Sequence, residues 1–224
     1  MRRFVRLNGL SLAFLALFLG ALCLQALAGY HEFNDEQEQH SEPGVSFGRY
    51  ITSSQFGSAV MENWQSEYLQ FTLFVLLTVW LVQRGSPESK DPGREGRGSD
   101  EDQLVGNHIR TESPRWARLE GLRRTLYENS LLIVMGAIWV CTWAVQSVTG
   151  LTEFNADQVT HRQERVSWLE YVGSADFWEK TLQNWQSEFL AVGSMVVLSI
   201  YLRQRGSPES KPVGAPHHAT GVEG

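Results

Sequence analysis

A seven-residue pattern occurs twice in this chain of 224 residues, and each time it runs directly into an apolar segment. "NWQSEYL" begins at Asn63 and "NWQSEFL" begins at Asn184, an offset of 121 positions. The same offset relates many other residues without a gap, including the octapeptide "QRGSPESK" at Gln83 and Gln204. The sequence therefore predicts two tandem copies of one structural unit, because self-similarity at a fixed period is typical of a repeat architecture.

The repeat also predicts how the chain is divided. We expect a first copy over 1–90, a flexible cytoplasmic linker over 91–115, a second copy over 116–211 and a disordered tail over 212–224. The linker is rich in glycine and in charges of both signs, which disfavours a packed core. The second copy is expected to open with a short helix on the inner membrane surface, because Trp116, Leu119, Leu122 and Leu126 recur near helical spacing among arginines.

Two long runs of the sequence, Leu7–Tyr30 and Asn129–Thr152, contain no charged side chain. Each is long enough to cross a bilayer core of about 30 Å at about 1.5 Å per residue. Two further segments, Trp64–Val82 and Trp185–Leu202, are apolar apart from one glutamate each. We therefore expect an all-α integral membrane fold with four transmembrane helices, arranged as two tandem parallel-repeat helical hairpins.

The first apolar run has an alternative interpretation as a cleavable signal peptide, because Arg2 and Arg3 precede it and "ALA" at Ala26–Ala28 follows. A membrane span is favoured, since the run is longer than a usual signal core and its copy is internal. Cys23 and Cys141 lie in the two charge-free runs at positions that the offset does not relate. They are interpreted as small buried hydrophobic residues and not as a disulfide or metal pair.

Basic residues near the span ends predict the orientation of the chain. Nine lysines and arginines lie in 84–128, whereas the loops 29–63 and 150–184 carry one and three basic residues against six acids each. We therefore expect both termini and the middle segment in the cytoplasm and both acidic loops outside. The net charge of −6 favours no nucleic-acid partner, and the cytoplasmic arginines suit the headgroups of a lipid bilayer.

Local signals predict where the helices begin and end. Ser53 and Ser174 are good N-cap residues. Each octapeptide is expected to end a span, with its arginine facing lipid phosphates, its glycine in a left-handed C-cap and its proline stopping the helix. These residues are Arg84, Gly85 and Pro87 in the first copy and Arg205, Gly206 and Pro208 in the second. An alternative is that the octapeptide docks a cytoplasmic partner.

A polar intramembrane cluster is predicted in each copy. Trp64 and Trp185 are expected to anchor at the outer interface, and Glu67 and Glu188 lie about one turn deeper, where a lone charge is costly. The clusters would comprise Gln25, Asn63 and Glu67 in the first copy and Gln146, Asn184 and Glu188 in the second. These side chains either join helices by hydrogen bonds or form a cation or proton site.

A third constellation lies in the outer loops, where two acids and a histidine recur at intervals of four. They are Glu32, Glu36 and His40 in the first copy and Glu153, Asp157 and His161 in the second. On a helix each set would share one face and could bind a divalent metal weakly. Zinc sites use more His or Cys ligands at tighter spacing, so we assign no metal site here and favour a solvated acidic helix.

"NWQSEFL" leading to "LRQRGSPESKPV", with "EFN", "DQ", "H", "VS" and "EY" ahead of it, resembles a family of bacterial membrane proteins catalogued only as domain of unknown function 6766. The resemblance covers essentially both copies. It implies a four-span protein of the bacterial inner membrane and supplies no activity. In this family the loop motif typically opens with Tyr-Asn-Glu-Glu-Gln. This chain has phenylalanine in place of the tyrosine, at Phe33 and Phe154, and Ala156 in place of an acid.

Enzyme signatures are missing from the sequence, which has no phosphate-binding glycine loop, no G-x-S-x-G and no H-E-x-x-H. We therefore expect a non-enzymatic structural or interaction protein of the envelope that needs no cofactor. The alternative is a small transporter or permeation pathway with a cation or proton site at Glu67 and Glu188. Four helices make a small pathway, so transport would require a homo-oligomer.

Overall fold

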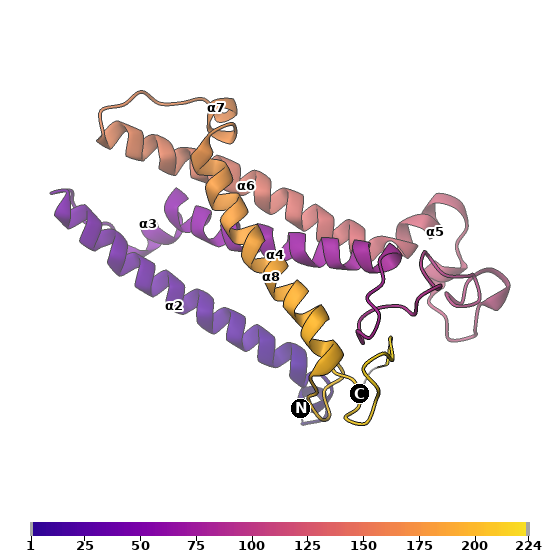
Figure 1. Cartoon of the computed structure of the whole chain (residues 1–224). Helices are drawn as coiled ribbons and strands as arrows, with labels where there is room; N and C mark the ends of the chain where they lie inside the picture. Colours follow the sequence, from indigo (N-terminus) through magenta and orange to yellow (C-terminus); the bar gives the residue numbers. More distant parts are fainter. Residues whose placement is uncertain (1, 223–224) are drawn as a thin grey trace. The chain divides into compact units, whose positions relative to one another are not determined.

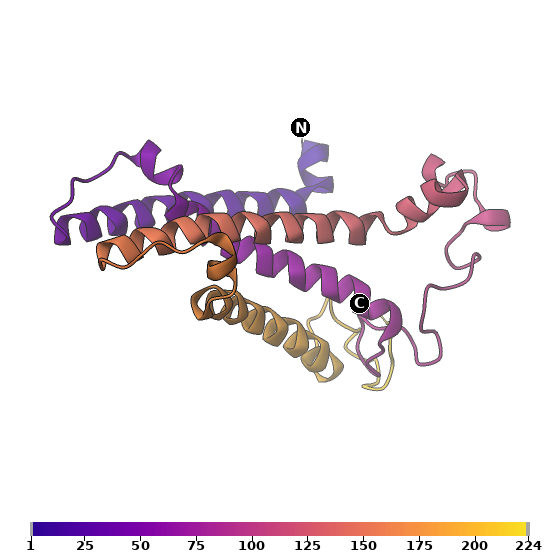
Figure 2. The same ribbon diagram turned by 90° about the horizontal axis from the view of Figure 1, so that it is seen from above.

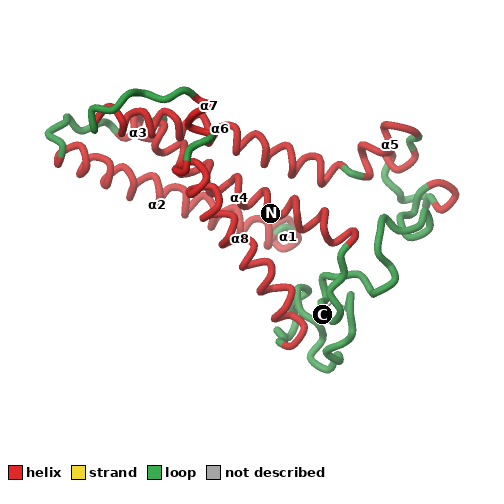
Figure 3. The backbone as a smooth tube through the Cα atoms, turned by 45° about the horizontal axis from the view of Figure 1, so that its top comes forward, coloured by secondary structure: helices red, strands yellow, loops and turns green. Residues whose placement is uncertain are grey.

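The computed structural model describes residues 2–222, and over these residues the chain forms helices and loops without a strand (Figure 3). The expected all-helical class is confirmed. Contacts divide the chain into two compact units. Unit 1 holds the residues up to Val60 together with Val148–Ser167, and unit 2 holds Met61–Ser147 together with the residues from Trp168 onward.

Most of the helices are labelled in Figure 1. Their bounds are α1 Arg2–Leu7, α2 Gly9–Gln39, α3 Phe47–Ile51, α4 Ser54–Trp80, η1 Gly106–His108, η2 Arg115–Arg118, α5 Gly121–Glu128, α6 Ser130–Thr160, α7 Trp168–Val172 and α8 Ala175–Tyr201. Three pairs, α2 with α6, α3 with α7 and α4 with α8, have both ends related by an offset of 121 residues. Corresponding sequences therefore adopt corresponding helices.

Helices α2 and α6 are the two that are long and apolar enough to cross a membrane. Each has 31 residues, which gives about 46 Å of helix. In their most apolar 18-residue stretches, 6% of the residues of α2 and 17% of those of α6 are buried. Most residues of these stretches are therefore at least partly exposed, unlike those of a core helix in a soluble protein.

Helices α4 and α8 do not meet the same criterion, so the expectation of four such helices holds for two. The reason is the length of their apolar parts. After Glu67 the apolar part of α4 ends at Trp80, and after Glu188 that of α8 ends at Tyr201. Each part gives about 20 Å of helix against a bilayer core of about 30 Å.

The predicted N-caps are confirmed. The Ser174 hydroxyl accepts a hydrogen bond from the Phe177 amide at 3.3 Å, and the Ser53 hydroxyl accepts one from the Phe56 amide at 3.2 Å. The long helices α2 and α6 each stop just before a left-handed residue, Ser41 in one case and Arg162 in the other, both at φ 59°. The cap and stop positions in the two halves are again related by the offset.

The short surface helix expected from Arg115 is wrong in its bounds. Arg115–Arg118 is a 3₁₀ turn, Leu119 and Glu120 are extended, and α5 begins only at Gly121, whose φ is 59°. The left-handed glycine breaks the helix that the spacing of the apolar residues suggested.

The expected burial of the two cysteines is also wrong. Both are free and exposed, Cys23 on α2 and Cys141 on α6. They lie on the outward faces of the two most apolar helices, so their side chains are not part of a protein core.

Candidate functional site

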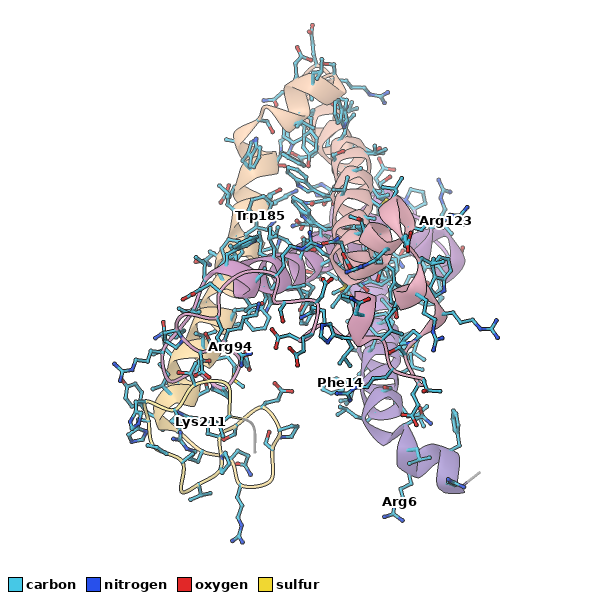
Figure 4. The ribbon with its side chains drawn as sticks, turned by 90° about the vertical axis from the view of Figure 1, so that its right-hand side faces the viewer. Arg6, Phe14, Arg94, Arg123, Trp185 and Lys211 are labelled. Atoms are coloured by element: carbon cyan, nitrogen blue, oxygen red, sulfur yellow. The ribbon has the colours of Figure 1, made fainter. Side chains whose placement is uncertain are left out.

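The two copies of the "NWQSE" motif meet where α4 and α8 cross in unit 2. The indole Nε1 of Trp185 donates a hydrogen bond of 2.8 Å to Oε1 of Gln65. The Gln65 side chain is fully buried, and its amide nitrogen donates to the Glu62 carbonyl at 3.2 Å. Trp185 is labelled in Figure 4 on α8, beside α4. The tryptophan predicted as an interface anchor thus also holds the two helices together.

One turn along the same contact, the two glutamates come together. Glu188 is half-buried and interacts electrostatically with Glu67, which is exposed. The buried Ser66 hydroxyl donates to the Asn63 carbonyl at 2.9 Å and is also within hydrogen-bonding reach of the Glu188 carboxylate. The sequence placed these glutamates in separate clusters, whereas in the structure the charge of Glu67 acts on Glu188.

The other four predicted members of the clusters are distributed over both units. Gln25 lies on α2 in unit 1 and is exposed. Gln146 is buried on α6 in unit 2, at 1% exposure. Asn184 donates its amide to the Lys180 carbonyl at 2.9 Å, one turn back along α8, while Asn63 is exposed on α4.

An aromatic cluster on α6 and α8 fixes the orientation of Trp185. The ring of Trp143 lies 5.8 Å from that of Trp185 and 6.0 Å from those of Trp139 and Trp178, between ring centroids. Phe177, at 1% exposure, completes the cluster at 6.1 Å. Rings at these separations attract each other beyond their area of contact, so the indole N–H is held in place to reach Gln65.

Tyr50 organises a corresponding aromatic cluster in unit 1. Its ring is 5% exposed and lies 5.7 Å from Phe33 and 5.5 Å from Phe56. Burial raises the pKa of the Tyr50 hydroxyl, and the nearby charges of Glu32 and Glu36 raise this pKa further. Two of the candidate metal ligands therefore act as acidic neighbours of a buried tyrosine.

The candidate metal ligands do not gather into a site. Among the described residues no three His, Cys, Asp or Glu side chains come close enough together to hold a metal ion. In the first loop Glu32, Glu36 and His40 are exposed along α2. In the second loop Nδ1 of His161 pairs with the Asp157 carboxylate at 3.3 Å, and Glu153 stands apart from this pair.

The asparagine of each "EFN" has a structural role that was not predicted from the sequence. Oδ1 of Asn34 accepts a hydrogen bond of 2.7 Å from the Val45 amide, and Oδ1 of Asn155 accepts one of 2.8 Å from the Val166 amide. Each asparagine thereby ties the loop back to the helix that precedes it. The recurrence of this asparagine in both copies is the sequence feature that could have indicated its structural role.

The two octapeptides fold into the same loop. In each, the backbone N–H of the opening glutamine donates a hydrogen bond to the hydroxyl of the second serine. The bond from Gln83 to Ser89 is 2.8 Å long, and that from Gln204 to Ser210 is 2.9 Å long. The left-handed glycines are confirmed at φ 89° and 82°. Their role as helix C-caps is wrong, because α4 and α8 end before the octapeptides begin. Arg84 and Arg205 are exposed on the loops beyond the helix ends.

Lys211, which ends the second octapeptide, holds the tail against the first one. Its ammonium, at 1% exposure, donates to the carbonyl oxygens of Gly85 at 2.6 Å, His217 at 2.9 Å and two other tail residues. The Gly85 amide in turn donates to the Thr220 hydroxyl at 2.9 Å. The tail expected to be disordered therefore makes defined contacts, and in Figure 2 it lies beside the segment that follows α4. Burial lowers the pKa of Lys211, and the charge of Arg203 lowers it further.

Comparison with known proteins gives one match. The family described as Domain of unknown function (DUF6766) matches residues 1–222. No curated protein and no solved structure matches the chain.

Proposed function

Since the chain belongs to the DUF6766 family, whose function is unknown, we propose from its own residues what it does: it is a multi-pass protein of the bacterial inner membrane that acts as a non-enzymatic structural or interaction protein of the cell envelope. In this proposal α2 and α6 cross the bilayer, and α4 and α8 complete two duplicated hairpins. Both termini and the middle segment lie in the cytoplasm.

The observation that carries the structural role is the joint between α4 and α8. It contains a hydrogen bond between side chains of the two helices, from the Trp185 indole to the buried Gln65. Polar side chains that bond across helices stabilise membrane bundles, because the alternative is an unpaired group in a medium without water. The outward-facing apolar surface of α2 and α6 supports membrane insertion.

One observation favours the alternative, a small transporter or permeation pathway. Glu67 and Glu188 lie close enough to repel each other when both are ionised. A proton or a cation bound beside these carboxylates would remove the repulsion. The remaining ligands of such a site would have to come from water, from a lipid or from a second copy of the chain.

A thermal melt of the full chain in detergent separates the two functions. We compare wild type with Glu67→Gln/Glu188→Gln, with and without added monovalent and divalent cations. The exposed carboxylates of Glu101 and Glu112 provide the control, Glu101→Gln/Glu112→Gln. A structural role predicts that no cation shifts the melting temperature of wild type. A cation-induced stabilisation of wild type that the control keeps and the double variant loses would favour the transporter.

A further inference from the structure

Two adjacent arginines on α5 have different partners. Nε of Arg124 lies 2.6 Å from the Glu128 carboxylate, and its Nη2 lies 3.2 Å from that of Asp100. Arg123 is exposed, and it pairs with none of the carboxylates that the structure describes. The positive charge of Arg124 is therefore neutralised within the protein, whereas that of Arg123 is left for an external partner.

The two arginines also point in different directions, about 100° apart around the helix. Arg123 falls between Leu126 and Tyr127, while Arg124 and Glu128 lie further round the helix, beyond Tyr127. Leu122 is 74% exposed and Leu126, on the same side, is 50% exposed. Arg123 thus stands beside two exposed leucines.

The turn η2 extends this face. The ring of Trp116 stacks on that of Tyr127, with 6.4 Å between centroids, and remains 60% exposed. Arg115 is exposed beside it, and the guanidinium of Arg118 bonds the Arg110 and Thr111 carbonyls, so its charge is not neutralised by an acid. We name this surface the basic foot. It comprises Arg115, Trp116, Arg118, Leu122, Arg123, Leu126 and Tyr127.

The basic foot stands next to a candidate span. α5 ends at Glu128 and α6 begins at Ser130, so α6 leaves the foot after one intervening residue. If α6 crosses the bilayer, α5 is held one residue away from the helix that enters the membrane, and Arg123 lies about two helical turns before it. A face that combines leucines, a tryptophan and arginines suits the boundary between headgroups and acyl chains.

We propose that the basic foot binds the headgroups of anionic phospholipids at the cytoplasmic surface, with Arg123 as its main phosphate ligand; the proposal rests on the membrane insertion argued above. The guanidinium can donate two parallel hydrogen bonds to one phosphate, which a lysine cannot do. Leu122, Leu126 and the Trp116 ring insert beside the acyl chains. Arg124 takes no part, because its charge is already neutralised by Glu128 and Asp100.

The test measures lipid retention by the full chain with native mass spectrometry, titrating phosphatidylglycerol against phosphatidylcholine. The variants are Arg123→Gln, Arg123→Lys and the adjacent Arg124→Gln, which removes the same charge from a guanidinium that is already paired with Glu128 and Asp100. Near a membrane surface one basic residue contributes roughly a fivefold change in affinity. We expect Arg123→Gln to lose about fivefold in affinity for phosphatidylglycerol, Arg123→Lys to lose less, and Arg124→Gln to stay within about twofold.

Equal losses for Arg123→Gln and Arg124→Gln, or no preference of wild type for phosphatidylglycerol, would overturn the proposal. Circular dichroism shows whether each variant keeps its helices. If Arg123→Gln does not fold, the comparison of Arg123→Lys with Arg124→Gln tests the proposal in its place. Extraction of cell membranes with alkaline carbonate tests the proposed function separately. A chain that resists extraction but has no lipid preference refutes the basic foot alone, whereas an extracted chain refutes the membrane-spanning proposal.

Discussion

At the scale of single residues, identical letters in the two copies do not have identical surroundings. Gln65 is fully buried and accepts a hydrogen bond from Trp185, whereas its counterpart Gln186 is exposed on α8. A sequence comparison marks both glutamines equally. The difference arises because α4 and α8 meet along one face, and only one of the two glutamines lies there.

This difference predicts an asymmetric effect of one substitution. Gln65→Leu leaves the Trp185 indole N–H without its acceptor inside a packed contact, so we expect a loss of about 1–3 kcal/mol in the free energy of unfolding. Gln186→Leu changes an exposed side chain and should stay within about 0.5 kcal/mol of wild type. Denaturant unfolding of both variants in the same detergent measures the two losses, and equal losses would contradict the α4–α8 joint.

A second residue-scale prediction concerns pH. Burial raises the pKa of Glu88 above its ordinary value of 4.5, and the charge of Glu209 in the other octapeptide raises it further. A carboxyl with a raised pKa in the folded state favours folding below its ordinary pKa and loses that contribution as pH rises through the raised value. The contacts between the octapeptides should therefore weaken from mildly acidic to neutral pH.

Glu88→Gln should remove this weakening, because a neutral amide neither repels Glu209 nor ionises. Hydrogen exchange of the amides in 83–90 is the measurement, compared between pH 4 and pH 7. In wild type we expect protection to fall between these values after correction for the intrinsic exchange rate, and in the variant we expect it to stay level. A variant whose protection falls as steeply as that of wild type would exclude this carboxyl pair as the cause.

At the scale of elements, the starts of α4 and α8 and the presence of α2 and α6 were predictable, because they depend on local chemistry. Ser53 and Ser174 mark the starts of α4 and α8, and runs without charge mark α2 and α6. The contacts between elements were not predictable in the same way. Nothing in the letters of the octapeptides indicates that Lys211 reaches the Gly85 carbonyl, since that contact depends on how the tail folds back.

The two octapeptide glycines provide the sharpest element-scale prediction. Both are left-handed, a conformation that costs alanine roughly 1–2 kcal/mol. A Cβ on Gly206 would meet nothing within 4 Å, whereas a Cβ on Gly85 would collide with the His217 carbonyl oxygen and press on Ile200. Gly85→Ala should therefore release the tail, and Gly206→Ala should not.

Limited proteolysis tests this prediction directly. We expect cleavage within 212–222 to be at least tenfold faster in Gly85→Ala than in Gly206→Ala, because both variants share the conformational cost and only Gly85→Ala adds the collision with His217. Lys211→Met, which removes the ammonium from its ring of carbonyls, should resemble Gly85→Ala. Equal cleavage in both glycine variants would mean that the tail is not held by the first octapeptide.

At the scale of the whole molecule, the number of spans decides what the duplication means. If α4 and α8 cross the bilayer with α2 and α6, the two copies share one orientation and their acidic loops face the same side. If only α2 and α6 cross, the loop after α2 and the loop after α6 face opposite sides. The glutamates of α4 and α8 make the second arrangement physically reasonable, because an ionised carboxylate in the bilayer is costly.

Labelling of single cysteines in intact cells distinguishes these arrangements. Cys23 and Cys141 are first replaced by alanine, which should be tolerated because both are exposed. A cysteine is then introduced at Ser41, Ser99 or Arg162, which are exposed in the first loop, the middle segment and the second loop. We expect an impermeant maleimide to label positions 41 and 162 from outside and position 99 only after permeabilisation. Labelling of 41 and 99 from outside, with 162 protected, would instead show two spans with a cytoplasmic N-terminus, and α4 and α8 would then have to pack outside the bilayer core.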